Sequence, residues 1–156
     1  MDPLLNREAV SEAVLAGRHV GVLAYEEGHP VAWVSVGPLN DFLWARPRVQ
    51  ALGADAPATA GILCFVVTPE RRRSGMQGHL LVALADYATR QDWASLEGYP
   101  FDPAACHAHP HEKLGYPGFV KPFEEYGFRR MGPHWNSRLG FERWIYRRPL
   151  GRSLRS

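Results

Sequence analysis

A continuous apolar stretch that runs into a basic, glycine-containing turn limits the possible folds most. Residues 61–67, GILCFVV, are apolar and include β-branched side chains, which predicts a strand buried on both faces. The turn TPERRRSG follows at 68–75. An apolar stripe at helical spacing comes next, formed by Met76, Leu80, Leu81, Leu84 and Ala88. The sequence therefore predicts a strand–turn–helix unit with a core beneath its helix.

The rest of the chain supplies the other strands and helices. Asn6 and Gly17 can cap a first helix at its two ends. Several prolines and glycines make 37–59 a predicted long loop, a type of segment that is often functional. The predicted order is α-β-β-β-α-β-α-β-β. Its other elements are a helix at 7–16, a hairpin at 20–36, a strand at 94–99, a loop at 100–117, a helix at 119–126, and a final hairpin from 128–135 and 143–150.

Composition excludes several classes of protein. The chain has 156 residues, 46% hydrophobic and 22% charged, which fits one globular domain and excludes wholesale disorder. A formal net charge of +2 does not demand a nucleic acid or an anionic membrane. No apolar run approaches the ~20 residues of a membrane span, and the first ten residues lack a signal-peptide pattern. We expect a cytoplasmic domain over 1–150, followed by a short basic tail at 151–156, with no nucleic-acid or membrane partner.

The basic turn has the features of a phosphate site. The first amides of a helix have no intrahelical acceptor, and the helix dipole makes that end partly positive. Gly75 lets the backbone approach a ligand, and Arg71, Arg72 and Arg73 add positive charge. A solvated basic turn is the alternative interpretation. Since neither G-x-x-x-x-G-K-[ST] nor G-x-G-x-x-G is present, the phosphate ligand is not expected to be a nucleoside triphosphate or a dinucleotide.

Residues 72–77, RRSGMQ, resemble the Arg/Gln-x-x-Gly-x-Gly/Ala signature of the GNAT superfamily of N-acetyltransferases. FEEYGF at 123–128 and RWIYRRPL at 143–150 are similar to later elements of that family, and SLEGYPFDPA at 95–104 resembles a bacterial subgroup. Gln77 replaces the usual small residue. The family's usual first strand has no expected counterpart here, because only five residues precede Asn6. The resemblance implies an α+β fold: a mixed, mostly antiparallel twisted sheet flanked by helices, which opens between 61–67 and 94–99.

The resemblance also implies the ligand and the reaction. In this family the loop amides hold the pyrophosphate of coenzyme A, and the strand backbone pairs with the pantetheine arm. The implied activity is transfer of an acetyl group from acetyl-CoA to an amine of a small molecule or peptide, and relatives are often homodimers. A non-catalytic coenzyme-A-binding or sensor domain is the alternative. The implied cofactor-binding residues are Phe65, Val66, Val67, Arg72, Arg73, Ser74, Gly75, Met76, Gln77 and Gly78.

The catalytic groups that many relatives use are missing. Phe123 stands where they have a tyrosine acid, and Gly61 where they have a glutamate. Glu97 is the best remaining candidate for a general base, with a structural ion pair as its alternative role. Tyr99 lies two residues on and faces the same side of a strand. Tyr116 and His109 are further candidates from the loop at 100–117.

Two other groups of residues bear on the acceptor and on metals. Trp44 and His109 are expected to line the acceptor pocket, because both lie in long loops. The run from Cys106 to His111 holds alternating histidines and a thiol, which are zinc-type ligands. Since no ligand-spaced partners are evident elsewhere, we expect no metal.

Overall fold

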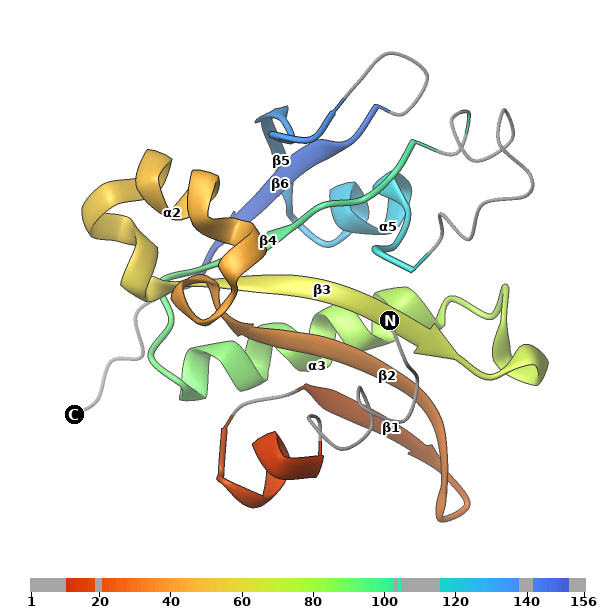
Figure 1. The fold of residues 1–156 in the computed structure, drawn as a ribbon. Coiled ribbons are helices and arrows are strands. Elements are labelled where there is room, and N and C mark those ends of the chain that lie inside the picture. The colour runs from red at the N-terminus through yellow and green to blue at the C-terminus, as the bar shows by residue number, and fades with distance from the viewer. Residues whose placement is uncertain (1–10, 19–20, 103, 105–115, 138–141, 152–156) are drawn as a thin grey trace.

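A computed structural model of the chain describes residues 11–18, 21–102, 104, 116–137 and 142–151. Its described part contains a six-stranded sheet of order β1-β2-β3-β4-β6-β5 (Figure 1). Only β3 and β4 run parallel, so the predicted mixed, mostly antiparallel sheet is confirmed. The strands are β1 (Val22–Glu26), β2 (His29–Pro38), β3 (Thr59–Val67), β4 (Ser95–Gly98), β5 (Arg129–Pro133) and β6 (Trp144–Pro149).

Both predicted hairpins form. β1 and β2 are joined by Glu27 and Gly28, which have φ values of 49° and 82°. Positive φ at both central residues is the geometry of a two-residue turn whose twist matches the flanking strands. β5 and β6 also pair antiparallel. Residues 11–15 are helical, whereas residues 1–10 lie outside the described part, so the expected absence of a further first strand stays a prediction.

The segment 37–59 is not the long loop that its prolines predicted. It folds into consecutive helical turns that pack on the sheet. Pro47 stands in the first turn of the α-helix, where a missing N–H costs nothing. Leu39 and Ala45 are fully buried in a small core with Tyr99. The elements are η1 (Leu39–Asp41), η2 (Leu43–Ala45), α2 (Arg46–Leu52) and η3 (Gly53–Ala58).

Two helices cover the opposite face of the sheet. These are α3 (Met76–Arg90) and α5 (Val120–Glu125), as predicted, and α3 runs along β2 and β3 in Figure 1. The predicted stripe of α3 is buried apart from Met76, which is half-buried. With β2, β3 and Phe123 of α5 it forms the main core. No helix in the described part of the chain is long and apolar enough to cross a membrane.

Only the first half of β3 is buried on both faces. Thr59 to Ile62 are buried, whereas Cys64 is half-buried and Val66 is 51% exposed. β4 ends at Gly98, the partner of Ile62, so the second half of β3 also lacks a strand neighbour on this edge. The prediction of full burial is therefore wrong for the second half of β3.

Candidate functional site

The sheet opens where β4 ends and β3 continues. Beyond Ile62, two residues of β3 turn their backbone groups to the open edge: the Phe65 amide donates to the Tyr116 carbonyl at 2.7 Å, and the Val67 carbonyl accepts from Arg72 Nε at 3.3 Å. Successive residues of a strand face opposite edges, so Val66 turns its backbone groups to Trp33 of β2. Val66 can therefore contact a ligand in the opening through its side chain but not through its backbone.

A cavity of about 760 Å³ lies along this open edge. Ligand sites in proteins have volumes of about 300–1,000 Å³, so it can hold a small molecule. It connects the second half of β3 to the start of α3. Its lining residues are Cys64, Phe65, Val66, Val67, Arg72, Gln77, Tyr116 and Phe119. Burial raises the pKa of the Cys64 thiol, which favours its neutral form.

The turn before α3 presents free backbone amides. Gly75 is the N-cap with φ 78°, and no side chain caps the helix there. A Cβ at Gly75 would meet no protein atom within 4 Å, so the space beside these amides is open. Ser74 donates its hydroxyl to the Arg71 carbonyl at 2.6 Å, which holds the turn closed. Gly75 is thus required for its left-handed backbone and leaves room for an anion.

The three arginines of the turn have different surroundings. Arg71 forms an ion pair with Glu26 of β1. Within the described residues, neither Arg72 nor Arg73 forms an ion pair, and both are exposed. Arg72 lines the cavity, and its Nε group contacts β3. Arg72 and Arg73 are therefore the two guanidinium groups available to an anionic ligand at this turn.

Two of the residues assigned to the phosphate loop face elsewhere. A Cβ at Gly78 would lie 2.5 Å from Cε2 of Tyr126, so this glycine allows the chain after α5 to pack on α3. The Gln77 side-chain amide donates to the Phe119 carbonyl at 3.3 Å and accepts from the Phe119 amide at 3.2 Å. The geometry does not support phosphate contacts by Gly78 or by the Gln77 side chain. Met76 packs half-buried against the main core.

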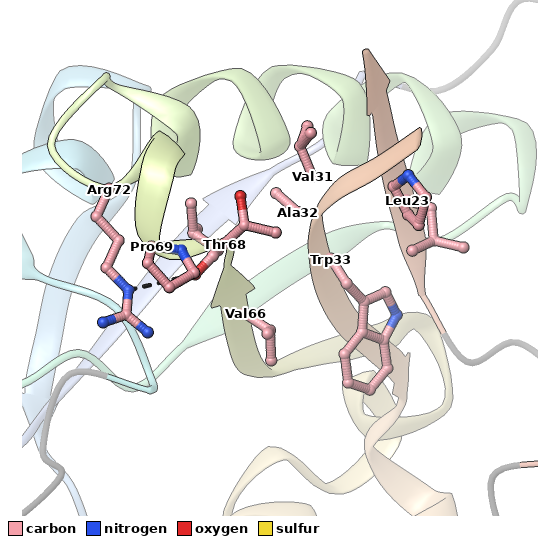
Figure 2. Close-up of a pocket in the computed structure, with 10 residues that line it drawn as sticks. Leu23, Val31, Ala32, Trp33, Val66, Thr68, Pro69 and Arg72 are labelled. Atoms are coloured by element: carbon pink, nitrogen blue, oxygen red, sulfur yellow. Dashed lines mark hydrogen bonds between the residues drawn. The ribbon is translucent and has the colours of Figure 1, made fainter. Parts of the chain in front are cut away.

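A second, apolar cavity of about 370 Å³ adjoins the first at the end of β3. The two cavities share Val66, Val67 and Arg72. Figure 2 shows the side chains of Trp33 and Val66 on one side of the sheet, with Arg72 at the far end of the cavity. No sequence pattern indicated this cavity, because its other lining residues come from β1, β2 and the turn: Leu23, Pro30, Val31, Ala32, Trp33, Thr68 and Pro69.

Glu97 is buried in an ion cluster and does not line the cavity. Its side chain is 0% exposed, and Arg48 Nε donates to its two oxygens at 2.9 and 3.2 Å. Arg147 lies 3.7 Å away, and the Tyr99 hydroxyl donates to Glu97 Oε2 at 3.4 Å. The hydrogen bond to Glu97 raises the pKa of Arg48, and burial raises the pKa of Tyr99 well above its usual value. The geometry favours the structural ion pair over a general base at Glu97, and Tyr99 is likewise enclosed.

Both missing family groups have a packing explanation. A Cβ at Gly61 would lie 2.6 Å from Leu39 Cδ2, so the position of the usual glutamate is filled by η1. Phe123 is fully buried, and its ring fills the space beside Gly98. Of the catalytic candidates that the structure describes, which are Glu97, Tyr99 and Tyr116, only Tyr116 lines the cavity, with 50% of its surface exposed.

Trp44 belongs to an aromatic cluster on the face covered by α2. It stacks on Trp135 with ring centroids 5.6 Å apart and is 43% exposed. Phe42, Tyr99 and His134 also belong to the cluster. Burial and the nearby Arg143 lower the pKa of His134 to about 3, so this imidazole is neutral near pH 7. Trp44 lines neither cavity, and its role in acceptor binding stays a prediction.

His109 and the run from Cys106 to His111 lie outside the described residues. Among the residues that the structure describes, no group of three or more histidine, cysteine, aspartate or glutamate side chains can hold a metal ion. The expected absence of a metal at that run stays a prediction.

The sequence and fold were compared with known proteins. Residues 3–116 match the family model described as the acetyltransferase (GNAT) family. The chain belongs to the GNAT acetyltransferase family. Acetyl-CoA is the co-substrate of this family, as the resemblance of residues 72–77 implied. No curated protein matches the chain.

Solved structures with this fold cover nearly all of the chain. An N-acetyltransferase from Staphylococcus aureus Mu50 has 15% identity, covers 96% of this chain and 79% of its own, and gives a TM-score of 0.63. A ribosomal-protein-alanine N-acetyltransferase from Brucella melitensis has 16% identity, coverage of 96% and 80%, and a TM-score of 0.61. YncA from Salmonella typhimurium, solved with its cofactor acetyl-CoA, has 16% identity, coverage of 97% and 75%, and a TM-score of 0.60. At these identities the likeness establishes the fold.

The site of this GNAT protein fits acetyl-CoA in most respects. The open space beside the Gly75 turn suits the pyrophosphate, as do Arg72 and Arg73, which form no ion pair with any described residue. Phe65 and Val67 turn toward the opening, as a partner for the pantetheine arm requires. The Phe65 amide, however, already has an acceptor within the chain.

Proposed function

We propose that this GNAT protein is an N-acetyltransferase that moves the acetyl group of acetyl-CoA to an amine of a small molecule or peptide. The observation that carries the proposal is one continuous cavity between the open edge of β3 and the uncapped start of α3, with Arg72 at its border. A thioester carrier needs an anion site and a polar strand edge within reach of each other, and this cavity joins the two.

The residues of the site suggest how the chain would promote transfer. When bound, acetyl-CoA supplies the thioester whose acyl carbon accepts the amine nitrogen as the thiol leaves. Arg72, Arg73 and the Gly75 turn hold the phosphate groups. The Phe65 amide points into the opening, where it can orient and polarise a carbonyl oxygen. The Tyr116 hydroxyl is the candidate proton donor for the leaving thiolate, because Tyr116 lines this cavity.

A non-catalytic coenzyme-A-binding domain is the second candidate. Among the described residues that line the cavity, only Cys64, Arg72 and Tyr116 carry ionisable side chains, and none is a carboxylate or an imidazole. The amine that attacks a thioester must lose a proton, and no described group in the cavity is an evident acceptor for it. If the protein is an enzyme, water can accept this proton. If nothing accepts the proton, the protein can bind coenzyme A but cannot catalyse the transfer.

Binding and turnover distinguish the two candidates. Under both, acetyl-CoA stabilises the folded state through mass action and so raises the melting temperature. At a concentration of a hundred times Kd, the gain in the free energy of unfolding is about 2.7 kcal/mol. Only an enzyme then releases free thiol when a library of amines, amino acids and peptides is added. Thiol release above the rate without an acceptor supports the transferase. A raised melting temperature with no release for any acceptor supports the binding domain, and no shift at all refutes both.

The partners and the cellular location follow as proposals. We infer that the protein acts in the cytoplasm on small ligands, without a nucleic acid or a membrane, because its net charge is only +2. Relatives are often homodimers, and we propose the same state here. Sedimentation at micromolar concentration checks the dimer, and DNA binding that persists at moderate salt would contradict the proposed partners.

A further inference from the structure

A short stretch of the chain lies across the opening between β3 and β4. The Tyr116 carbonyl accepts the Phe65 amide of β3 at 2.7 Å. Two residues later, the Gly118 carbonyl accepts the amide of Phe101, just beyond β4, at 3.3 Å. Phe101 also bridges in parallel to Phe119. Residues 116–119, which we call the bridging segment, therefore connect the two strands where they have separated.

Gln77 fixes one end of the bridging segment. Its side-chain amide makes both hydrogen bonds that the Phe119 backbone offers, at 3.2 and 3.3 Å. Gly118 is confined between this amide and the sheet: its φ is +87°, and a Cβ would lie 2.5 Å from Gln77 Nε2 and 2.9 Å from the Phe65 ring. The bridging segment is thus held at Phe119 by α3 and at Tyr116 by β3.

The Phe65 amide is the group for which two acceptors would compete. It points into the opening, and our proposed function assigns it to the carbonyl groups of the thioester arm. One N–H at 2.7 Å from one acceptor cannot serve a second acceptor at full strength. The Val67 carbonyl, further along this edge, is likewise in contact with Arg72. The chain's own atoms thus occupy two of the backbone groups on the edge that acetyl-CoA would use.

We propose that the bridging segment occupies the open edge of β3 to which the pantetheine arm of acetyl-CoA would bind, and that Gln77 is the positioning residue that holds it there. The inference rests on the proposed function. Binding of acetyl-CoA then displaces the Tyr116 carbonyl from the Phe65 amide and releases Phe119 from Gln77. The same movement shifts the Tyr116 side chain, which lines the cavity. Gln77, which replaces the family's usual small residue, thereby sets how readily the open edge of β3 becomes free for acetyl-CoA.

The affinity for acetyl-CoA measures this competition. When only a fraction of the molecules is competent to bind, the apparent Kd equals the intrinsic Kd divided by that fraction. Gln77→Ala removes two hydrogen bonds that favour the occupied edge. Since one net hydrogen bond changes an equilibrium by about two- to tenfold, we expect Gln77→Ala to bind acetyl-CoA about three- to tenfold more tightly than the wild type.

A ligand without the arm is the matched control. Adenosine 3′,5′-bisphosphate carries the nucleotide end of coenzyme A and no pantetheine, so its Kd, measured by calorimetry, should be the same for Gln77→Ala and the wild type. A second readout is the Phe65 amide resonance, which should move in the variant without ligand and in the wild type with acetyl-CoA. Tightening for both ligands would place the effect of Gln77 in the phosphate turn and overturn the inference.

A second variant tests the bridging segment independently of Gln77. Gly118→Ala adds a methyl group where no space exists and where φ is +87°, so it should displace the segment and tighten acetyl-CoA binding too. Unchanged or weaker binding in both variants refutes the inference while leaving the proposed function standing. Wild-type protein that binds no acetyl-CoA refutes the proposed function itself, and the inference with it.

Discussion

Arg72 and Arg71 differ by one position, and their substitutions should have different effects. Arg72 lines both cavities and has no ion-pair partner among the described residues, whereas Arg71 forms an ion pair with Glu26. A charged hydrogen bond contributes about 1.5–3 kcal/mol, which corresponds to roughly 10- to 150-fold in Kd. Arg72 is exposed, and solvent weakens its interactions. We therefore expect Arg72→Ala to weaken acetyl-CoA binding by about tenfold.

Arg71→Ala is the matched control, because it removes the same charge from the same turn. It loses an exposed ion pair, which is worth about 0–1 kcal/mol of folding stability, and should change Kd less than ~3-fold. Calorimetry at low and high salt gives both values, and the difference between the two variants should shrink as salt screens the phosphate contact. Equal losses in both variants would show that the turn acts only through its total charge, and the assignment of Arg72 would then be wrong.

Four further substitutions test the other assignments. Glu97→Gln should lower the free energy of unfolding by about 3–5 kcal/mol, measured in urea, because it takes the carboxylate from the partly buried Arg48 and from Arg147. Tyr116→Phe should lower kcat by about 100-fold with acetyl-CoA affinity unchanged, as expected for the loss of a proton donor. Gly78→Ala should destabilise the fold by about 1–3 kcal/mol through its clash with Tyr126, yet leave Kd for acetyl-CoA within about threefold. His134 has a folded pKa of about 3 and an unfolded value near 6.5, so the unfolded chain binds more protons between these values and stability falls as the pH drops through that window. His134→Gln should therefore flatten the acid side of the stability curve, by up to about 1.4 kcal/mol per pH unit.

Each of these has a result that contradicts it. A stable Glu97→Gln protein with a ~100-fold loss of rate would restore Glu97 as the base. Full activity in Tyr116→Phe would remove Tyr116 from the chemistry. A Gly78→Ala protein that is stable but no longer binds acetyl-CoA would return Gly78 to the phosphate loop. An acid profile unaltered by His134→Gln would mean that other groups cause the acid sensitivity.

Local patterns predicted the parts of the fold that local physics determines. The strand–turn–helix unit around Gly75 was recognisable because side-chain period, turn residues and helix start all lie within thirty residues of each other. The helical turns of 37–59 were missed because a proline such as Pro47 both breaks a helix and begins one. Which role it takes depends on whether the following side chains find a core, and that core includes Tyr99, far along the chain.

The candidate site was predictable only in part, for the same reason. Gly75 and Gly78 look alike in sequence, but one has φ 78° beside open space and the other meets Tyr126. For Glu97 the sequence left a general base and a structural ion pair both open, because its partner Arg48 stands 49 residues earlier in a segment expected to be a loop. The hydrogen bonds of Gln77 to Phe119 span 42 residues, and no periodicity marks them.

The buried ion cluster ties together three parts of the chain that are distant in sequence. Arg48 comes from α2, Glu97 from β4 and Arg147 from β6. Moving α2 off the sheet would remove Arg48, the partner closest to the buried Glu97 carboxylate, and would leave it only Arg147 and the Tyr99 hydroxyl, at a cost of several kcal/mol. The ion cluster therefore favours the packing of α2 on β4 in the folded domain. We expect a change of shape that admits an acceptor to come from segments other than α2.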